Sequence, residues 1–279
     1  MSDASGTLFI VPTPIGNLGD ISQRALNVLA DVAVICAEDT RHTAQLLHHF
    51  GIRTALQSLH DHNEKQKAGF IIGKILAGDD VALVSDAGTP LISDPGYTLV
   101  SQCREKGIKV VPLPGPCAAI TALSASGLAT DRFAFEGFLP AKQSARLAAL
   151  ETLADEPRTL VFYESPRRLL DTLADMQQAF GGERQLVVAK ELTKTFETIY
   201  GASIDEMRQW LAEDSDRQKG EMVLMVAPAP KSDALPKAAV TLFLALAEQL
   251  PRKQAATLVA DAFGLKKNAL YKLGLESDS

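Results

Sequence analysis

The stretch VALVSDAGTPLISDPG at residues 81–96 decides the fold that we predict for this chain. The run from Val81 to Ser85 is short, apolar and β-rich, which indicates a buried parallel strand. Gly and Pro then break the strand, and the small residues around them leave backbone N–H groups open to a ligand. Asp94 and Pro95 predict the N-cap and first position of a helix over about residues 96–106.

The same pattern returns one βα unit later. A second strand is predicted over residues 109–113, and it enters the tight loop Pro114-Gly115-Pro116-Cys117. Ligands of open α/β sheets bind in the crevice outside the carboxyl ends of the strands. The two loops therefore predict a cofactor site, although two ordinary βα turns would produce a similar sequence.

Short apolar runs alternate with helical periodicity through the first half, which predicts a parallel sheet with right-handed crossovers. The strands are expected at residues 7–11, 32–37, 54–59, 81–85 and 109–113. After a candidate linker at residues 127–131, the second half continues as α/β with mixed strand directions. Its strands are expected at residues 133–138, 159–163, 185–189, 195–200 and 222–227. We therefore predict two α/β domains, residues 1–128 and 129–230, with a ligand cleft between them.

Composition restricts the class of protein. The chain has 279 residues, 46% hydrophobic and 22% charged, as in an ordinary globular protein. No apolar run approaches the roughly 20 residues of a membrane span, so we expect no membrane partner. The three cysteines show no CxxC spacing, which suits reduced thiols in the cytoplasm. The net charge of −6 excludes a uniformly basic surface but leaves room for a local basic patch.

The polar linker PAPKSDALP at residues 228–236 leads to a tail, residues 237–279, that we expect to be helical. Helix is predicted from Pro251 to Leu275. Ala260, Gly264 and Leu270 have the offsets of a helix-turn-helix, whose second helix would carry three lysines toward phosphates. A plain helical hairpin packed on the body would have the same spacing.

All five histidines fall within residues 42–62, and three of them lie on predicted strand-end loops beside acids. One interpretation is a metal site made of Asp39, His60 and His62. No spaced ligand motif supports it, and we expect no metal. A polar substrate pocket on the same rim as the cofactor loops is favoured, and solvated loop histidines remain the alternative.

Taken together, the motifs resemble the tetrapyrrole-methylase-like class of S-adenosylmethionine (SAM) methyltransferases. Within it, the chain is similar to the enzymes that methylate a ribose 2′-hydroxyl of small-subunit ribosomal RNA. The segments that carry the resemblance cover nearly the whole chain: IVPTPIGNLGDISQRAL, AEDTRHT, LHDHNE, LVSDAGTPLISDPG, VPLPGPCAAITALSASGL, FYESPRR, AKELTKTFETI and KGEMVL.

The resemblance implies that SAM lies in the cleft between the domains and is held largely by backbone groups. The implied contacts are Pro14, Ile15, Asp86, Ala87, Gly88, Thr89, Ile92, Cys117, Ala118, Tyr163, Glu164 and Leu192. The chain departs from the class where Thr89 replaces the Asp of the GDP loop, and Asp86 is a candidate replacement. Pro12 and Pro14 also stand where the class has glycines.

The implied activity is SAM-dependent 2′-O-methylation of a cytidine in the decoding region of 16S rRNA, by a homodimer. The hydroxyl must lose its proton, so a general base is expected. Asp39 and His60 are the first candidates, with Glu38 and Glu191 behind them. Expected RNA contacts are Arg41, His42, His62, Arg167, Arg168, Lys194, Lys266, Lys267 and Lys272. The alternatives are a methylase of a tetrapyrrole or other small molecule and a non-catalytic nucleic-acid-binding regulator.

Overall fold

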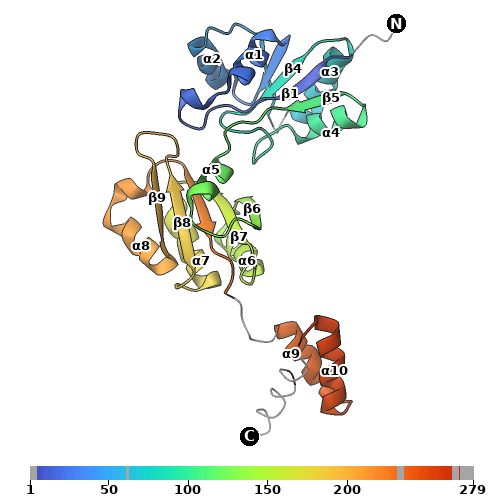
Figure 1. Ribbon diagram of the computed structural model, residues 1–279, viewed down its shortest axis with the longest axis vertical. Coiled ribbons are helices and arrows are strands. Elements are labelled where there is room, and N and C mark those ends of the chain that lie inside the picture. The colour runs from blue at the N-terminus through green and yellow to red at the C-terminus, as the bar shows by residue number, and fades with distance from the viewer. Residues whose placement is uncertain (1–4, 61–62, 231–235, 266–269, 271–279) are drawn as a thin grey trace. The chain divides into compact units, whose positions relative to one another are not determined.

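The structure is a computed structural model that describes residues 5–60, 63–230, 236–265 and 270. The chain divides into two compact units, residues 1–228 and residues 229–279. The first unit contains two five-stranded sheets, and the second is helical (Figure 1). Among the described residues, no helix combines the length and the apolar character needed to cross a membrane.

The first sheet is entirely parallel, as predicted. Its strands are β1 (Thr7–Ile10), β2 (Val34–Ala37), β3 (Leu56–Ser58), β4 (Val81–Val84) and β5 (Lys109–Pro112), in the order β3-β2-β4-β1-β5. Every residue of β2 and β4 is buried, which explains their continuous apolar sequences. Because the strands are parallel, their five carboxyl-end loops meet along one edge of the sheet, which we call the rim.

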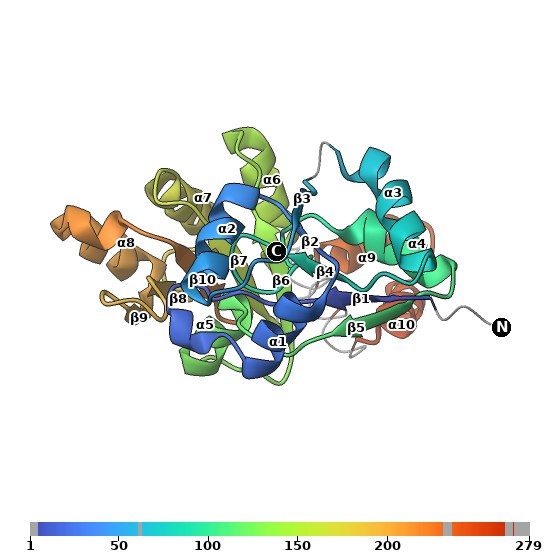
Figure 2. The same cartoon turned by 90° about the horizontal axis from the view of Figure 1, so that it is seen from above.

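Helices cover both faces of this sheet (Figures 1 and 2). On one face, α3 (Glu64–Leu76) and α4 (Tyr97–Glu105) pack on the side chains of Leu8, Cys36 and Leu83. On the other face, α1 (Gln23–Asp31) and α2 (Thr40–His49) pack on Ile35, Ala37 and Val84. Alternate residues of one strand thus serve opposite cores, which fixes the register of the sheet.

The predicted start of α4 at Asp94-Pro95 is wrong, because the helix begins at Tyr97. Leu91 and Ser93 adopt left-handed backbone conformations, with φ of 73° and 69°, and delay the helix by a tight loop. The N-terminal cap comes from another helix. Buried Glu64 accepts a hydrogen bond from the Leu99 N–H at 2.9 Å. A tertiary contact therefore sets this boundary.

The second sheet is mixed, as predicted. Its strands are β6 (Phe133–Phe138), β7 (Thr159–Glu164), β8 (Gln185–Lys190), β9 (Thr198–Ser203) and β10 (Met222–Val226), in the order β6-β7-β10-β8-β9. Only the β6–β7 pair is parallel within this described sheet. β9 begins three residues after the predicted position, since Lys194 and Glu197 donate backbone hydrogen bonds within a turn that consumes Thr195.

One face of the second sheet is covered by α6 (Gln143–Thr152), α7 (Leu169–Phe180) and α8 (Ile204–Glu213), and the other by α5 (Ala118–Ala125). A short 3₁₀ turn, Leu18–Asp20, precedes α1, and another, Ser215–Gln218, precedes β10. Between α6 and α7, the side chains of Arg146 and Asp175 form a buried ion pair at 2.6 Å. Gln143 donates a further hydrogen bond to Asp175 at 3.1 Å, so both carboxylate oxygens are used.

The second unit contains α9 (Lys237–Ala247) and α10 (Arg252–Phe263), which pack around buried Phe243 and Val259. The helix-turn-helix spacing predicted Gly264 as the turn glycine, and α10 does end there, at a left-handed C-cap. The helical stretch predicted from Pro251 to Leu275 is thus interrupted at this turn, and its part beyond Leu265, apart from Leu270, lies outside the described residues. Buried Leu270 belongs to the same core. Lys266, Lys267 and Lys272 lie outside the described residues.

Candidate active site

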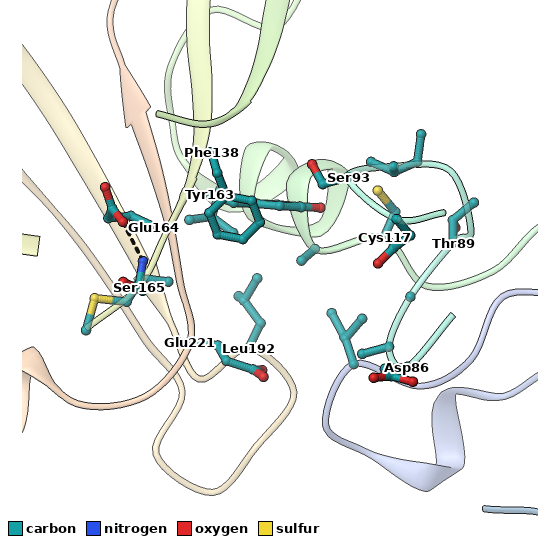
Figure 3. Close-up of a pocket in the computed structure, with 18 of the residues that line it drawn as sticks. Asp86, Thr89, Ser93, Cys117, Phe138, Tyr163, Glu164, Ser165, Leu192 and Glu221 are labelled. Atoms are coloured by element: carbon teal, nitrogen blue, oxygen red, sulfur yellow. Dashed lines mark hydrogen bonds between the residues drawn. The ribbon is translucent and has the colours of Figure 1, made fainter. Parts of the chain in front are cut away.

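A pocket of about 440 Å³ lies where the rim of the first sheet faces the second sheet (Figure 3). Eleven of the twelve predicted cofactor contacts line it: Ile15, Asp86, Ala87, Gly88, Thr89, Ile92, Cys117, Ala118, Tyr163, Glu164 and Leu192. Pro14 does not line the pocket. Segments separated by more than 200 residues of sequence thus form one site, which has the size of a small-molecule pocket.

The rim loops that form one wall are tied to one another. Thr13 and Gly88 exchange backbone hydrogen bonds of 2.9 and 3.0 Å, which join the β1 loop to the β4 loop. Thr89 donates its hydroxyl to the Pro116 carbonyl at 2.8 Å, so it joins the β4 loop to the β5 loop. Asp86 accepts the Asp39 N–H at 3.0 Å and extends the connection to the β2 loop. Thr89, which replaces the Asp of the class's GDP loop, and Asp86, the candidate substitute for that Asp, therefore both hold this wall in place.

The opposite wall comes from the second sheet. Glu164 is buried, and its carboxylate accepts hydrogen bonds from the Ser165 N–H, from Arg168 Nε and from the Thr172 hydroxyl at 2.5 to 2.8 Å. The Tyr163 hydroxyl accepts the Ala119 N–H at 3.2 Å, and burial raises the pKa of this phenol. Arg168, predicted as an RNA contact, therefore supports the pocket wall through Glu164.

Leu192 reaches the pocket from a strained turn after β8. Its neighbours Glu191 and Thr193 have φ values of 52° and 64°, which are unfavourable for residues with side chains. Lys194, another predicted RNA contact, holds this turn by donating to Glu191 at 3.0 Å and to Glu221 at 2.9 Å. Its ammonium is thus engaged in two ion pairs at the pocket edge.

The β1 loop crosses to that turn at Gly16. A Cβ atom at residue 16 would lie 2.5 Å from Lys194 Cγ and 2.9 Å from both the Leu192 carbonyl and the Thr193 hydroxyl. Real Cβ atoms do not come so close to other heavy atoms, so only glycine fits. The backbone of the first half therefore touches the turn of the second half directly.

Neither predicted catalytic residue lines the pocket, whereas Glu38 does. Asp39 caps α2, and its carboxylate accepts hydrogen bonds from the Arg41 N–H, Nε and Nη2 at 2.7 to 3.1 Å. The hydrogen-bonded guanidinium of Arg41 holds the pKa of Asp39 well below its usual range. Asp39 is thus a weak base at neutral pH.

The other predicted rim groups that the structure describes lie outside the pocket lining. Asn63 fixes the His60 ring by a contact of 2.8 Å to Nε2 and accepts the His60 N–H at 3.0 Å. Arg41, His42 and Arg167 are exposed to solvent, and His62 lies outside the described residues. Within the described part of the chain, no three His, Cys, Asp or Glu side chains gather as metal ligands.

Sequence reasoning missed nine of the lining residues: Ser93, Asp94, Phe138, Ser165, Pro166, Ala189, Glu221, Met222 and Val223. Most of them adjoin a motif that was recognised. Glu221, for example, stands inside KGEMVL, and its position beside Lys194 is visible only after β8 and β10 have paired.

Two family models match this chain. The family model of tetrapyrrole (corrin/porphyrin) methylases matches residues 7–208, and a model described as the RsmI C-terminal HTH domain matches residues 233–278. The fold is shared with a uroporphyrin-III C-methyltransferase from Thermus thermophilus, with a TM-score of 0.56, 19% identity, and coverage of 80% of this chain and 94% of that one. Diphthine synthase gives a TM-score of 0.60 at 13% identity, covering 80% and 90% of the two chains. The chain therefore belongs to the tetrapyrrole methylase family of SAM-dependent methyltransferases.

Its curated relatives identify the branch of that family. A protein of Haemophilus influenzae is 60% identical over 99% of this chain and 98% of its own length, and one of Escherichia coli O157:H7 is 58% identical over 98% and 96%. Both are named Ribosomal RNA small subunit methyltransferase I. This chain belongs to the methyltransferase I group.

The charge of the pocket fits SAM. Among the described residues, the lining holds five carboxylates, Glu38, Asp86, Asp94, Glu164 and Glu221, and neither Lys nor Arg. Two of them pair with cations next to the lining, Glu164 with Arg168 and Glu221 with Lys194. A sulfonium ligand with an ammonium group suits such a lining, whereas a dinucleotide pyrophosphate does not. Apolar Leu192, Ile92 and Val223 add walls for a planar ring. The residues present therefore fit SAM and argue against a nicotinamide cofactor.

Cys117 provides a direct test of this cofactor site. It lines the pocket and is partly exposed, whereas burial raises the pKa of Cys36 to about 12 and that of Cys103 to about 11. Iodoacetamide should therefore modify Cys117 first in the folded protein. Because ligand binding removes the free form by mass action, SAM at ten times its Kd should slow that modification about tenfold.

Peptide mass spectrometry would measure this labelling, with NAD as the control ligand. A Cys117 that reacts equally fast in the presence of calorimetrically bound SAM would place the cofactor elsewhere.

Proposed function

We propose that this protein methylates the ribose 2′-hydroxyl of a cytidine in the decoding region of 16S rRNA, with SAM bound in the pocket between the two sheets. The observation that carries this proposal is the similarity to the methyltransferase I proteins over almost the whole chain, including residues 233–278. The acidic pocket supports the cofactor part of the proposal.

The bound cofactor supplies an electrophilic methyl group, and the protein has to position and deprotonate the hydroxyl. Orientation of the hydroxyl by the fixed rim loops contributes to lowering the barrier. Among Glu38, Asp39 and His60, we assign the general base to Glu38, because it alone of the three lines the pocket. Asp39 organises the start of α2, and His60 stays a candidate for holding the substrate.

Binding of RNA falls mainly to basic groups that are exposed to solvent. Arg41, with its side chain 88% exposed, lies on the rim side, and exposed Arg167 follows β7. His42 is exposed beside Arg41, and His62 and the tail lysines keep their proposed roles. Arg168 and Lys194 stay proposed as contacts, although both already hold carboxylates of the pocket wall.

The domain limits 1–128, 129–230 and 237–279, the homodimer and the cytoplasmic location also stay proposals.

The test uses radiolabelled SAM and small ribosomal subunits that lack the modification. The expected result is label in 16S rRNA at a nucleotide whose 3′ phosphodiester resists alkali, since a methylated 2′-oxygen cannot attack it. Free 16S rRNA in parallel distinguishes the substrate from the assembled subunit. SAM binding without rRNA labelling would favour the small-molecule methylase. A protein that binds RNA but not SAM would favour the regulator.

Removal of residues 236–279 tests the role of the tail. The shortened protein should bind SAM as tightly as the full chain, because every described residue of the pocket lining precedes residue 224. Its affinity for small subunits should fall, and the salt dependence of binding should become shallower because phosphate contacts are lost. Filter binding at several salt concentrations measures both. Unchanged affinity and slope would exclude the tail from RNA binding.

A further inference from the structure

A β-bulge aims one aromatic side chain into the pocket. In the parallel pair of β6 and β7, Phe135 lies opposite Val161, and Gly137 lies opposite Phe162, so one residue of β6 is extra. Gly137 adopts a φ of 64°, as bulges often require. The shift places Phe138 opposite Tyr163, on the face that lines the pocket. In regular pairing it would lie opposite Glu164, on the other face.

Phe138 is the most accessible aromatic ring in the described pocket lining. It is 56% exposed, and its ring meets that of Tyr163 edge to face, with centroids 5.6 Å apart (Figure 3). The apolar residues deeper in the site are much less exposed, 7% for Leu192 and 3% for Val223. Phe138 therefore presents exposed aromatic surface in the pocket lining, whereas Leu192 and Val223 are buried walls suited to the cofactor.

The charge of the pocket determines which part of an RNA could reach that ring. Beside the two lining carboxylates that pair with Arg168 and Lys194, the described lining carries three more, and these repel phosphates. A nucleotide can enter only with its uncharged base and sugar leading and its phosphates left outside. Enzymes that act on a nucleotide inside folded nucleic acid commonly extrude it in this way and stack its base on aromatic side chains.

We propose that Phe138 stacks against the base of the nucleotide whose ribose is methylated. This inference rests on the proposed RNA substrate, and it adds a positioning contact that holds the sugar at the methyl donor. The same ring could instead contact the adenine of SAM, and the experiment separates the two.

The experiment compares Phe138→Ala, Phe138→Leu and Phe138→Trp with the unmodified enzyme on small subunits. Base–aromatic stacking predicts a roughly tenfold to hundredfold loss of kcat/KM for the Ala and Leu variants, while Trp retains most of the activity. The Kd for SAM should stay the same in all three. The matched control is Phe70→Ala, since Phe70 is 59% exposed on α3 and does not line the pocket.

Two results would overturn the inference. One is an Ala variant with unchanged kcat/KM, and the other is a loss of SAM affinity that accounts for the whole defect. A Phe138→Leu variant as active as Phe138→Trp would also overturn the inference, because an apolar contact without an aromatic ring would then be enough. Failure of the unmodified enzyme to label 16S rRNA would instead refute the proposed function. Thermal melting of each variant checks that the exposed site tolerates the change.

Discussion

Glu38→Gln should lower the turnover of methyl transfer by about 10²- to 10⁴-fold, the range expected for loss of a positioned general base. The Kd for SAM should change little, because glutamine keeps the shape of the side chain and four other carboxylates remain in the lining. Single-turnover kinetics on small subunits measure the chemical step, and calorimetry measures SAM binding.

Asp39→Asn and His60→Gln are the matched comparisons, since they alter the neighbouring rim groups outside the pocket lining. Both should retain more turnover than Glu38→Gln. If Glu38→Gln turned over normally and either comparison variant failed at unchanged SAM affinity, the base would be that residue.

Asp175→Ala should destabilise the second sheet by about 3–5 kcal/mol, because it leaves the buried guanidinium of Arg146 without its partner. The combined change Arg146→Met with Asp175→Leu should recover most of that stability, since no unpaired charge remains. Urea unfolding followed by the single tryptophan, Trp210 on α8, reports on this part of the fold.

Glu213→Ala is the control for this prediction. It removes an ion pair to Arg217 in which the Glu213 side chain is 67% exposed, so the unfolding midpoint should hardly move. Equal losses for Asp175→Ala and Glu213→Ala would show that the buried pair contributes no more than a surface pair does.

The sequence predicted the parts of the molecule that depend on local pattern. Continuous apolar strands and loops of small residues were enough to predict the parallel sheet and a cofactor site at its rim, whereas the eleven lining residues came from the resemblance to a known family. The start of α4 depends on Glu64, more than 30 residues away, and no local pattern contains that information. The position of Phe138 depends on a one-residue bulge that reverses the face it occupies.

The sequence alone also could not show which of two adjacent acids, Glu38 or Asp39, is the better candidate for the general base. Glu38 and Asp39 are adjacent, and only the direction of the chain at the end of β2 decides which one reaches the pocket. Arg168 and Lys194 looked like free basic groups, because their carboxylate partners come together only in the fold. The sequence shows that a residue is basic, but it shows neither which carboxylate pairs with that residue nor how exposed its side chain is.

The contact at Gly16 has a consequence for how this enzyme can evolve. The first half needs a residue without a side chain at position 16. The second half needs the turn around Leu192, with its left-handed residues, that packs against Gly16. A half taken from a distant homologue by recombination would bring a different partner to this junction. A chimaera of two such halves should fold only where the turn that it brings leaves the same room at Gly16.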